Sequence, residues 1–278
     1  MNRISQLVFF LCVSCLLSAC APKAIKMNPV HDNFYSTLWL QTASESKALA
    51  YQVYQSATRY LDEAVFDSSW TASLEQHGDY ESLPTAVILD VDETVLDNAR
   101  FQANMVLEGI LYDEQEWDRW VSLASAPALP GAVEFINKAN ELGVEVFYIT
   151  NRECYKRSSE TAQCPQKVDT INNLRAVGIK EVKSHHVMLK YEHKDWLSEK
   201  LTRRNEVVKS YRVLMLLGDD LGDFLPHVKS NTSISERNRL VKQHAENWGS
   251  KWFILSNPTY GSWMNILGKN KRQHLKGF

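Results

Sequence analysis

The chain has 278 residues, of which 44% are hydrophobic and 23% are charged, a composition typical of a globular protein that is long enough for one large domain. Its formal net charge of -2 gives no basic surface, so we expect no nucleic-acid partner. After residue 20 no stretch is both long and apolar enough to cross a membrane.

The first 19 residues are typical of a secretion signal. Arg3 precedes an apolar stretch, residues 7–17, that is too short to span a bilayer. The tetrapeptide Leu17-Ser18-Ala19-Cys20 resembles the lipobox of bacterial lipoproteins, in which cleavage leaves a lipidated cysteine at the new N-terminus. The resemblance implies a signal peptide over residues 1–19 and a lipid on Cys20. Because Ala21 rather than Asp follows, it implies the outer membrane of a bacterial cell; an ordinary secretory peptide is the alternative.

Residues 20–35 contain two prolines and are predicted to be a tether, whereas residues 36–278 are predicted to be the functional domain. Between Ser36 and Phe66 apolar and aromatic residues recur every three or four positions, which predicts one or two amphipathic helices. A loop is expected from residue 68 to residue 84.

Residues 86–89 form a short apolar run that ends at Asp90 and Asp92. Such a run predicts a strand buried on both faces. Residues i and i+2 of an extended chain point to the same side, so the two carboxylates can converge on one small ligand or ion. Close carboxylates repel each other unless a cation, a proton or strong donors hold them. This strand end is therefore either a catalytic site or an acidic turn.

Helices and strands alternate through the rest of the chain. We predict helical segments over residues 101–124, 130–142, 168–177, 195–209 and 235–248, and strands over residues 144–149, 186–189, 211–217 and 252–255. This alternation predicts an α/β fold, with a parallel sheet covered by helices on both faces. Ligands bind at the carboxyl ends of such strands. Asp90, Thr150 and Asp219 should therefore meet at one edge of the sheet.

Cys154 and Cys164 are the two cysteines that remain after the signal peptide and Cys20 are set aside. Thiols oxidise outside the cytoplasm, which favours a disulfide that closes the loop between them. Two free thiols are the alternative.

At this point four motifs resemble those of the haloacid dehalogenase (HAD) superfamily. They are Asp90-Val91-Asp92-Glu93-Thr94, Thr150, a lysine between residues 190 and 200, and Gly218-Asp219 with Asp223. Segments 88–98 and 218–224 more narrowly resemble the paired signatures of class C acid phosphatases, which include outer-membrane lipoproteins acting as 5′-nucleotidases. The resemblance implies a HAD-like Rossmannoid sheet with a small helical partial cap. One departure is Asp220, where Asn or Thr is usual, and an added carboxylate there is expected to alter metal affinity or pH optimum.

The resemblance implies Mg2+-dependent hydrolysis of phosphomonoesters through an aspartyl phosphate. Asp90 would be the nucleophile, and Asp92 the general acid and then the general base. Mg2+ would bind Asp90, the backbone carbonyl of Asp92 and Asp219. Asp223 would hold a water on the metal or orient the lysine.

Phosphate oxygens would be bound by Thr150, Asn151 and Lys200, and Arg152 would extend this group. Lys200 lies in the segment 198–204, which resembles the Ser-x-Lys-x-x-Arg stretch of the family. Lys190 is the alternative phosphate-binding lysine.

The leaving group would carry a nucleobase or nicotinamide ring that stacks on aromatic side chains. The candidates are Tyr260, Trp117, Trp120 and Phe101, with core packing as the alternative for the last three. Short spans between motifs leave no room for a large cap, so we expect an open site that accepts many substrates, nucleoside 5′-monophosphates among them. The competing functions are a phosphotransferase of the same fold and a non-catalytic surface lipoprotein that binds haem or a host ligand. A homodimer is compatible with the sequence.

Overall fold

The computed structural model describes residues 31–158 and 160–278. Residues Asn33–Phe278 form one compact unit. The predicted signal peptide, the predicted lipid site Cys20 and most of the predicted tether lie outside the described residues. Among the helices that are described, none combines the length and the apolar character needed to cross a membrane.

The unit is built on a five-stranded parallel sheet, as the alternation of elements predicted. The strands in spatial order are β3 (Val187–Lys190), β2 (Glu145–Glu153), β1 (Thr85–Leu89), β4 (Arg212–Gly218) and β5 (Trp252–Ile254). The strand that ends at Asp90 is therefore the central one, and the carboxyl ends of its neighbours lie beside its own.

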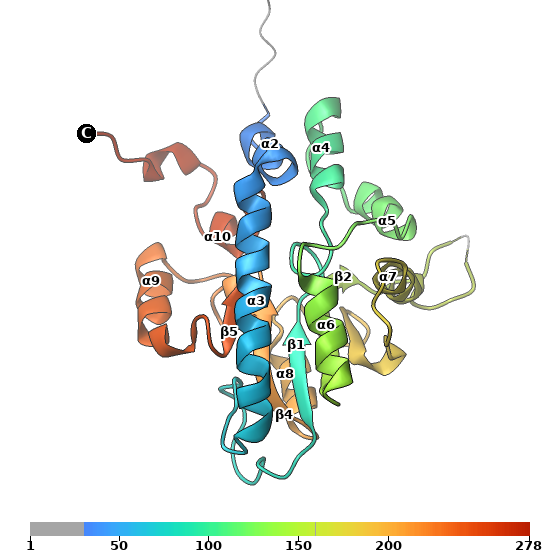
Figure 1. Cartoon of the computed structure of the whole chain (residues 1–278). Helices are drawn as coiled ribbons and strands as arrows, with labels where there is room; N and C mark the ends of the chain where they lie inside the picture. Colours follow the sequence, from blue (N-terminus) through green and yellow to red (C-terminus); the bar gives the residue numbers. More distant parts are fainter. Residues whose placement is uncertain (1–30, 159) are drawn as a thin grey trace, which may run out of the picture. The chain divides into compact units, whose positions relative to one another are not determined.

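Helices cover both faces of the sheet. They are α2 (Phe34–Thr42), α3 (Ser44–Phe66), α4 (Ala99–Glu108), α5 (Glu114–Ser122), α6 (Ala132–Glu141), α7 (Pro165–Ala176), α8 (Leu201–Val208), α9 (Ile234–Gln243) and α10 (Ser262–Asn265). Figure 1 shows α3 and α6 in front of the sheet and α8 behind it. Four short 3₁₀ turns complete the described elements: η1 (Ser184–His186), η2 (Leu221–Asp223), η3 (Ala245–Asn247) and η4 (Lys271–His274).

The apolar run of β1 is continuous because the strand is buried on both faces. Val87 and Leu89 pack into a core cluster with residues of α3, α6 and α7. Ala86 and Ile88 pack into a second cluster that includes Val207 of α8. These four residues of β1 are at most 4% exposed. A strand with two buried faces needs no alternation of polar and apolar residues.

The small helical partial cap consists of α4 and α5, which lie between β1 and α6 in the chain, and of α2 packed against α4. The side chain of Gln41 donates to the carbonyl of Ala99 and ties α2 to the start of α4. The predicted helix over residues 101–124 is split into two because Gly109 adopts a left-handed backbone with φ of 65° and ends α4.

Two predicted boundaries were wrong near the site. Strand β2 continues to Glu153, because Thr150 and Glu153 still pair with β3. The predicted helix over residues 195–209 begins only at Leu201, since the preceding segment forms turns in which Tyr191 donates to the carbonyl of Trp196. Lys200 consequently lies at the N-terminal end of α8 rather than inside a helix.

Candidate active site

Three carboxylates meet at the carboxyl edge of the sheet. Asp90 follows β1, Asp219 follows β4 and Asp223 ends η2, and their oxygens lie within 4.8 Å of one another. The backbone N–H of Asp90 donates to the carbonyl of Leu217 at 2.9 Å, so the end of β1 is fixed against the end of β4. Asp90 and Asp223 are buried and Asp219 is half-buried.

Lys200 supplies a positive charge to this group. Its Nζ donates to Oδ1 of Asp90 and lies 2.6 Å from Oδ1 of Asp223, and its side chain is 4% exposed. Lys190, the alternative lysine, instead lies 2.6 Å from the carboxylate of Glu153. Of the two lysines weighed from the sequence, Lys200 is thus the one at the carboxylates.

The carboxylates carry more negative charge than Lys200 balances. Burial, together with the nearby Asp223 and Asp92, raises the pKa of Asp90 to about 6 although Lys200 opposes the change. Burial and the charges of Asp90 and Asp223 raise the pKa of Asp219 well above its usual range. Three hard oxygen donors that repel one another fit a divalent cation such as Mg2+. The group could therefore bind a metal ion.

Asp92 is not part of this carboxylate group but is held by hydrogen-bond donors. Nη2 of Arg152 lies 2.8 Å from its Oδ1, and Nε lies 3.1 Å from the same oxygen. Oγ1 of Thr150 donates to Oδ2 at 3.3 Å and Nδ2 of Asn98 donates to Oδ1 at 3.0 Å. Asn98 is itself oriented by the indole N–H of Trp120, which donates to Oδ1 of Asn98 at 2.8 Å.

The residues predicted to bind phosphate lie at the same edge, but Arg152 contacts other groups than predicted. Thr150 is fully buried, and Asn151 accepts a hydrogen bond from Nη2 of Arg203 at 2.8 Å. Arg152, predicted to extend the phosphate-binding group, places its guanidinium on Asp92 and on Thr170 instead.

Two further basic residues near the site had no role assigned from the sequence. Arg203 is fully buried and donates to the carbonyl of Thr150. Lys229 donates to the carbonyl of Ser198 at 2.8 Å and so ties the segment after η2 to the segment that carries Lys200. Arg203 falls in the quoted 198–204 stretch, whereas nothing in the sequence pattern pointed to Lys229.

The carboxylate of Asp220 is not one of the three carboxylates grouped at the site, so an effect of Asp220 on metal affinity or pH optimum stays a prediction. Its oxygens accept hydrogen bonds from Gly222 and Ser262. The carboxylate of Asp220 therefore makes its hydrogen bonds with residues of neighbouring segments.

The aromatic candidates occupy different environments, and Trp120 is the one whose indole N–H donates to Asn98. Phe101 is 4% exposed and packs edge-to-face on Trp117, with ring centroids 4.9 Å apart. Trp117 is half-buried, and the guanidinium carbon of Arg152 lies 5.8 Å from its ring centroid. Tyr260 is half-buried, and its backbone N–H donates to Asn257, whose amide donates to Asp219 at 2.8 Å. Trp117 and the segment of Tyr260 are therefore each linked to a carboxylate of the site.

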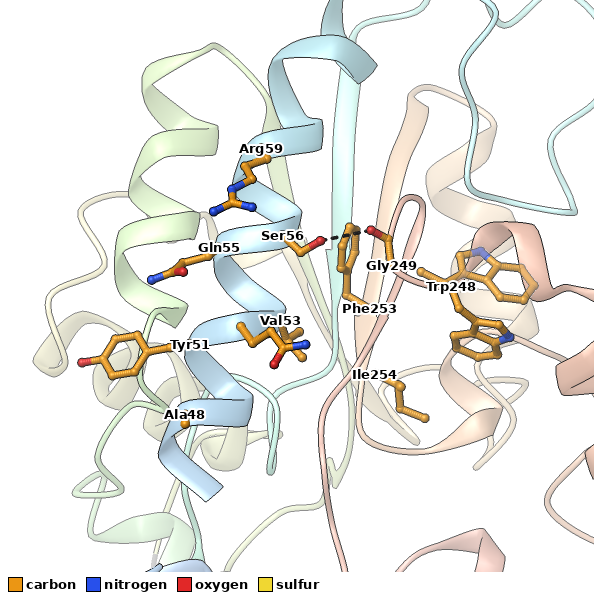
Figure 2. Close-up of a pocket in the computed structure, with 12 residues that line it drawn as sticks. Ala48, Tyr51, Val53, Gln55, Ser56, Arg59, Trp248, Gly249, Phe253 and Ile254 are labelled. Carbon is orange, nitrogen blue, oxygen red and sulfur yellow. Dashed lines mark hydrogen bonds between the residues drawn. The ribbon is translucent and has the colours of Figure 1, made fainter. Parts of the chain in front are cut away.

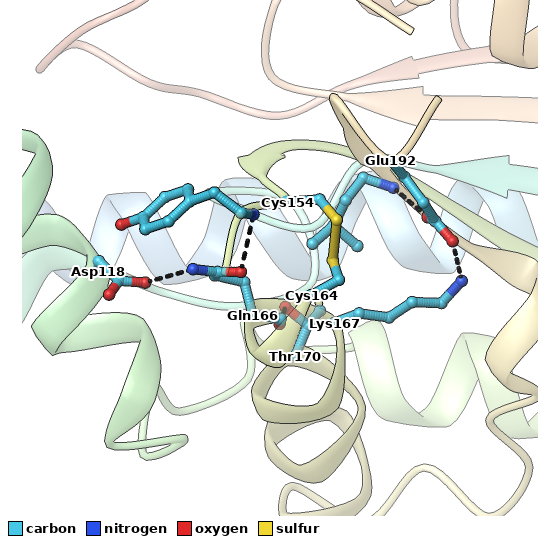
Figure 3. The surroundings of a disulfide bond; sticks show 9 residues. Asp118, Cys154, Cys164, Gln166, Lys167, Thr170 and Glu192 are labelled. Atoms are coloured by element: carbon cyan, nitrogen blue, oxygen red, sulfur yellow. Dashed lines mark hydrogen bonds and ion pairs between the residues drawn. A yellow bond between two sulfur atoms is a disulfide. The ribbon is translucent and has the colours of Figure 1, made fainter. Parts of the chain in front are cut away.

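Cys154 and Cys164 form a disulfide, which confirms the favoured prediction (Figure 3). In the loop that it closes, Arg157 lies 2.7 Å from the carboxylate of Asp118 in α5. Asp118 also accepts a hydrogen bond from Gln166 at the start of α7, a contact visible in Figure 3. The loop therefore fastens the cap helix that carries Trp117 to the body of the fold.

A pocket between α3 and the segment around β5 lies apart from these residues (Figure 2). Its walls include Tyr51, Arg59, Trp248 and Ile254, and no predicted site residue lines it. The candidate chemistry therefore belongs to the carboxyl edge of the sheet and not to this pocket.

The chain matches two solved structures along most of its length. Both are the class C acid phosphatase from Bacillus anthracis, one of them with tungstate bound. Each is 31% identical to this chain, and the matches cover 88% of this chain and 96% of the other, with TM-scores of 0.72 and 0.71.

Two curated plant proteins match a shorter region. Acid phosphatase 1 of Solanum lycopersicum is 30% identical over 142 residues, and the stem 31 kDa glycoprotein of Glycine max is 27% identical over 142 residues. Each match covers 50% of this chain and 51% of the plant protein, so the chain spans about half the length of these relatives. The family described as HAD superfamily, subfamily IIIB (acid phosphatase) matches residues 16–263. The chain therefore belongs to subfamily IIIB of the HAD superfamily, the acid phosphatases.

Proposed function

We propose that this acid phosphatase is a Mg2+-dependent phosphomonoesterase that hydrolyses nucleoside 5′-monophosphates through an aspartyl phosphate on Asp90. The observation that carries the proposal is the position of Asp90. It follows the central strand, lies among the carboxylates of Asp219 and Asp223, and accepts a hydrogen bond from Lys200. A carboxylate held in such a place is suited to attack phosphorus.

Asp90, Asp219 and the backbone carbonyl of Asp92 would hold Mg2+, with Asp223 close by to bind a metal water and Lys200. When bound, the cation would offset the repulsion among the carboxylates and polarise a phosphate oxygen. The proposal is supported by the raised pKa of Asp90 and of Asp219, which burial and the neighbouring charges produce.

The chain's own residues divide the reaction into two steps. In the first, an oxygen of Asp90 bonds to phosphorus, the bond from phosphorus to the leaving oxygen breaks, and Asp92 gives that oxygen a proton. In the second, Asp92 takes a proton from water as the water oxygen bonds to phosphorus, and the bond to Asp90 breaks. The hydrogen bonds from Arg152 and Asn98 fix the orientation of Asp92 for both transfers.

Thr150, Asn151 and Lys200 would donate hydrogen bonds to the phosphate oxygens and so stabilise the charge of the transition state. The burial of Thr150 and Lys200 favours this role, because a donor in a site shielded from water stabilises charge more strongly than one in solution. Tungstate is a tetrahedral oxyanion like phosphate, so the related structure that contains it adds support for an oxyanion site.

The leaving group would stack between the half-buried rings of Trp117 and Tyr260, and Phe101 would support Trp117 from within the cap. The small cap leaves the site open, which suits a broad set of phosphomonoesters. We further propose a lipid on Cys20 that anchors the protein in the outer membrane, a proposal that rests on the tetrapeptide ending at Cys20.

The test is release of phosphate from adenosine 5′-monophosphate at about pH 5.5, an acidic pH suited to an acid phosphatase. Wild type and Asp90→Asn are assayed with Mg2+ and with chelator. We expect loss of activity on chelation and on substitution, with phosphate equal to adenosine. Phosphate that falls short of adenosine would indicate a phosphotransferase. Nucleotide binding without turnover, equal in both proteins, would indicate a binding scaffold.

A further inference from the structure

Helix α5 of the cap carries two tryptophans on one face. Trp117 and Trp120 are three residues apart, which makes them neighbours on the surface of a helix. Both are half-buried. The start of the helix is fixed because the side chain of Asp113 accepts the backbone N–H groups of Gln115 and Glu116, at 2.9 and 3.1 Å. The two rings are therefore presented together by a helix with a firm beginning.

Each of these rings contacts a residue that donates a hydrogen bond to Asp92. The guanidinium carbon of Arg152 lies over the ring of Trp117, 5.8 Å from its centroid. The indole N–H of Trp120 donates to Oδ1 of Asn98 at 2.8 Å. Arg152 and Asn98 in turn both donate to Oδ1 of Asp92. One helix of the cap thus contacts two residues that hold the proposed general acid.

The side chain of Asn98 faces Asp92 instead of capping a helix. Asn98 is fully buried and precedes α4, a position where an asparagine side chain usually accepts a backbone N–H. It caps no backbone N–H of α4, a helix whose residues are all described, and its oxygen accepts the indole N–H of Trp120 instead. An indole N–H can only donate, so the amide NH2 is left at the end that meets Asp92 and Glu93. Trp120 therefore sets both the place and the direction of this amide.

The resulting contacts make the two oxygens of Asp92 unequal. Oδ1 accepts Nη2 of Arg152 at 2.8 Å and Nδ2 of Asn98 at 3.0 Å. The contacts of Oδ2 with Nε of Arg152 and Oγ1 of Thr150 are longer, at 3.2 and 3.3 Å. In the proposed function Thr150 donates to a phosphate oxygen, which leaves Oδ2 with only the longer arginine contact. A protonated carboxyl group carries its O–H where fewer donors face it, so Oδ2 is the oxygen suited to carry the proton.

We propose that Trp120 is a positioning residue for proton transfer, because through Asn98 it holds Oδ1 of Asp92 and so leaves Oδ2 to give its proton to the leaving oxygen. This inference rests on the proposed function, in which Asp92 is the general acid. Loss of the indole N–H would remove the donor at the amide oxygen and let the amide and the carboxyl group turn. Substrates whose leaving group needs a proton would then react more slowly, whereas substrates whose leaving group departs as a weakly basic anion would not.

A purely structural role for Trp120 must be separated from this one. Its ring also packs against the core cluster, so its removal would loosen α5 and displace Trp117. Such loosening would affect substrates with an aromatic ring alike, whatever the basicity of their leaving group. The variant Trp120→Phe is suited to the test because phenylalanine keeps an aromatic ring for packing and removes only the N–H donor.

The experiment measures kcat/KM at saturating Mg2+ for benzyl phosphate and 4-nitrophenyl phosphate, which each carry one aromatic ring. The first releases a strongly basic alkoxide that needs a proton, and the second releases a weakly basic phenolate. For Trp120→Phe we expect kcat/KM to fall by about tenfold with benzyl phosphate, which is the size of one hydrogen bond and less than the whole contribution of a general acid. With 4-nitrophenyl phosphate we expect it to stay within about twofold.

Trp248→Phe is the matched control. Trp248 is also half-buried, and its indole N–H donates to the carbonyl of Val241 at 3.0 Å, so this variant loses a comparable hydrogen bond outside the site. We expect kcat/KM of Trp248→Phe to stay within about twofold of wild type with both substrates. A tenfold loss confined to benzyl phosphate in this control as well would overturn the proposal, because the effect would not depend on Asn98.

The same measurements in an Asp92→Asn background complete a double-mutant cycle. If Trp120 acts through Asp92, Trp120→Phe causes no further loss with benzyl phosphate in that background. An equal loss on both substrates, no loss on either, or an additive loss in the double variant would overturn the proposal and leave the phosphatase function intact. A loss in Asp92→Asn alone that is equal on both substrates would overturn the role of Asp92 and this inference with it. Absence of phosphate release by wild type would overturn the proposed function itself.

Discussion

Arg152 and Asp92 are 60 residues apart in the chain, yet Nη2 of Arg152 lies 2.8 Å from Oδ1 of Asp92. The arginine side chain is 1% exposed and the aspartate side chain is 13% exposed. Removing one partner of a buried ion pair costs about 3 to 5 kcal/mol, because the other charge is left uncompensated. The pair therefore fixes the proposed general acid strongly in place.

Arg152→Gln should lower kcat by about 100-fold, since a general acid contributes at least that factor and loses its orientation here. Steady-state kinetics on adenosine 5′-monophosphate provide the measurement. Arg119→Gln is the matched control, because Arg119 is 73% exposed and pairs only across the surface of α5 with Glu116. A kcat for Arg152→Gln within about twofold of wild type would show that the ion pair does not serve catalysis.

Lys200→Gln should lower the rate of phosphate release by about 1000-fold, because a donor to the phosphate oxygens is lost. It should also destabilise the protein by about 3 to 5 kcal/mol at neutral pH, since Asp90 and Asp223 lose a buried partner. Denaturant unfolding and phosphate release measure the two effects. Lys190→Gln, which breaks the pair with Glu153 and the contact of Lys190 with the Tyr191 ring, should keep its activity. The reverse result would assign the phosphate-binding role to Lys190.

The raised pKa of Asp90 predicts a pH-dependent stability in the absence of metal. Its value of about 6 lies above the ordinary 3.8, so between these pH values the folded protein binds a proton that the unfolded chain releases. The contribution of Asp90 to the free energy of unfolding is therefore fully present below about pH 4. It is lost as the pH rises through about 6, which lowers the free energy of unfolding by at most about 3 kcal/mol. The thermal midpoint of chelated wild type, minus that of Asp90→Asn, should fall across this window.

Mg2+ should reverse this trend because protons and the cation compete for the same oxygens. We expect Mg2+ to raise the thermal midpoint of wild type more at about pH 7 than at about pH 4.5. An Mg2+ effect that is the same at both pH values would argue that Asp90 is not among the ligands.

The disulfide should raise the free energy of unfolding and hold the cap helix α5 in position. Opening a loop of this size costs about 2.5 kcal/mol through the entropy of the unfolded chain. Because Arg157 in the loop binds Asp118 of α5, reduction should also raise KM for nucleotides by about threefold through a less firmly placed Trp117. Chemical denaturation and kinetics with and without reductant measure these effects. The variant Cys154→Ser/Cys164→Ser is the control and should not respond to reductant; a response there would assign the effect to something else.

The central strands could be predicted from the sequence because β1, β2 and β4 each contain an apolar run that is followed within two residues by a carboxylate or a hydroxyl. Asp90, Thr150 and Asp219 needed only the rule that parallel strands end at one edge. The Arg152–Asp92 pair could not be predicted, because the pairing depends on how β2 extends past Thr150 to Glu153. That extension is set by pairing with β3, which local residue patterns do not encode.

The contacts of Asp220 could not be predicted from the sequence either. The sequence marked the residue as an unusual carboxylate beside Asp219, and its neighbours in the chain suggested a metal role. Its partner Ser262 is 42 residues away, and the backbone N–H that it donates carries no sequence signal. Side-chain to backbone contacts of this kind become visible only when the loop after β5 is folded.

The measurement that tests the central claim most directly is detection of the phosphoryl group on Asp90. With 4-nitrophenyl phosphate, whose leaving group departs without a proton, Asp92→Asn should form the phosphoenzyme and hydrolyse it slowly, because the general base for the second step is gone. Acid quench followed by peptide mass spectrometry should then find one phosphoryl group on the peptide that contains Asp90, and none in Asp90→Asn. A phosphoryl group on another residue, or turnover by Asp90→Asn at the wild-type rate, would contradict the account.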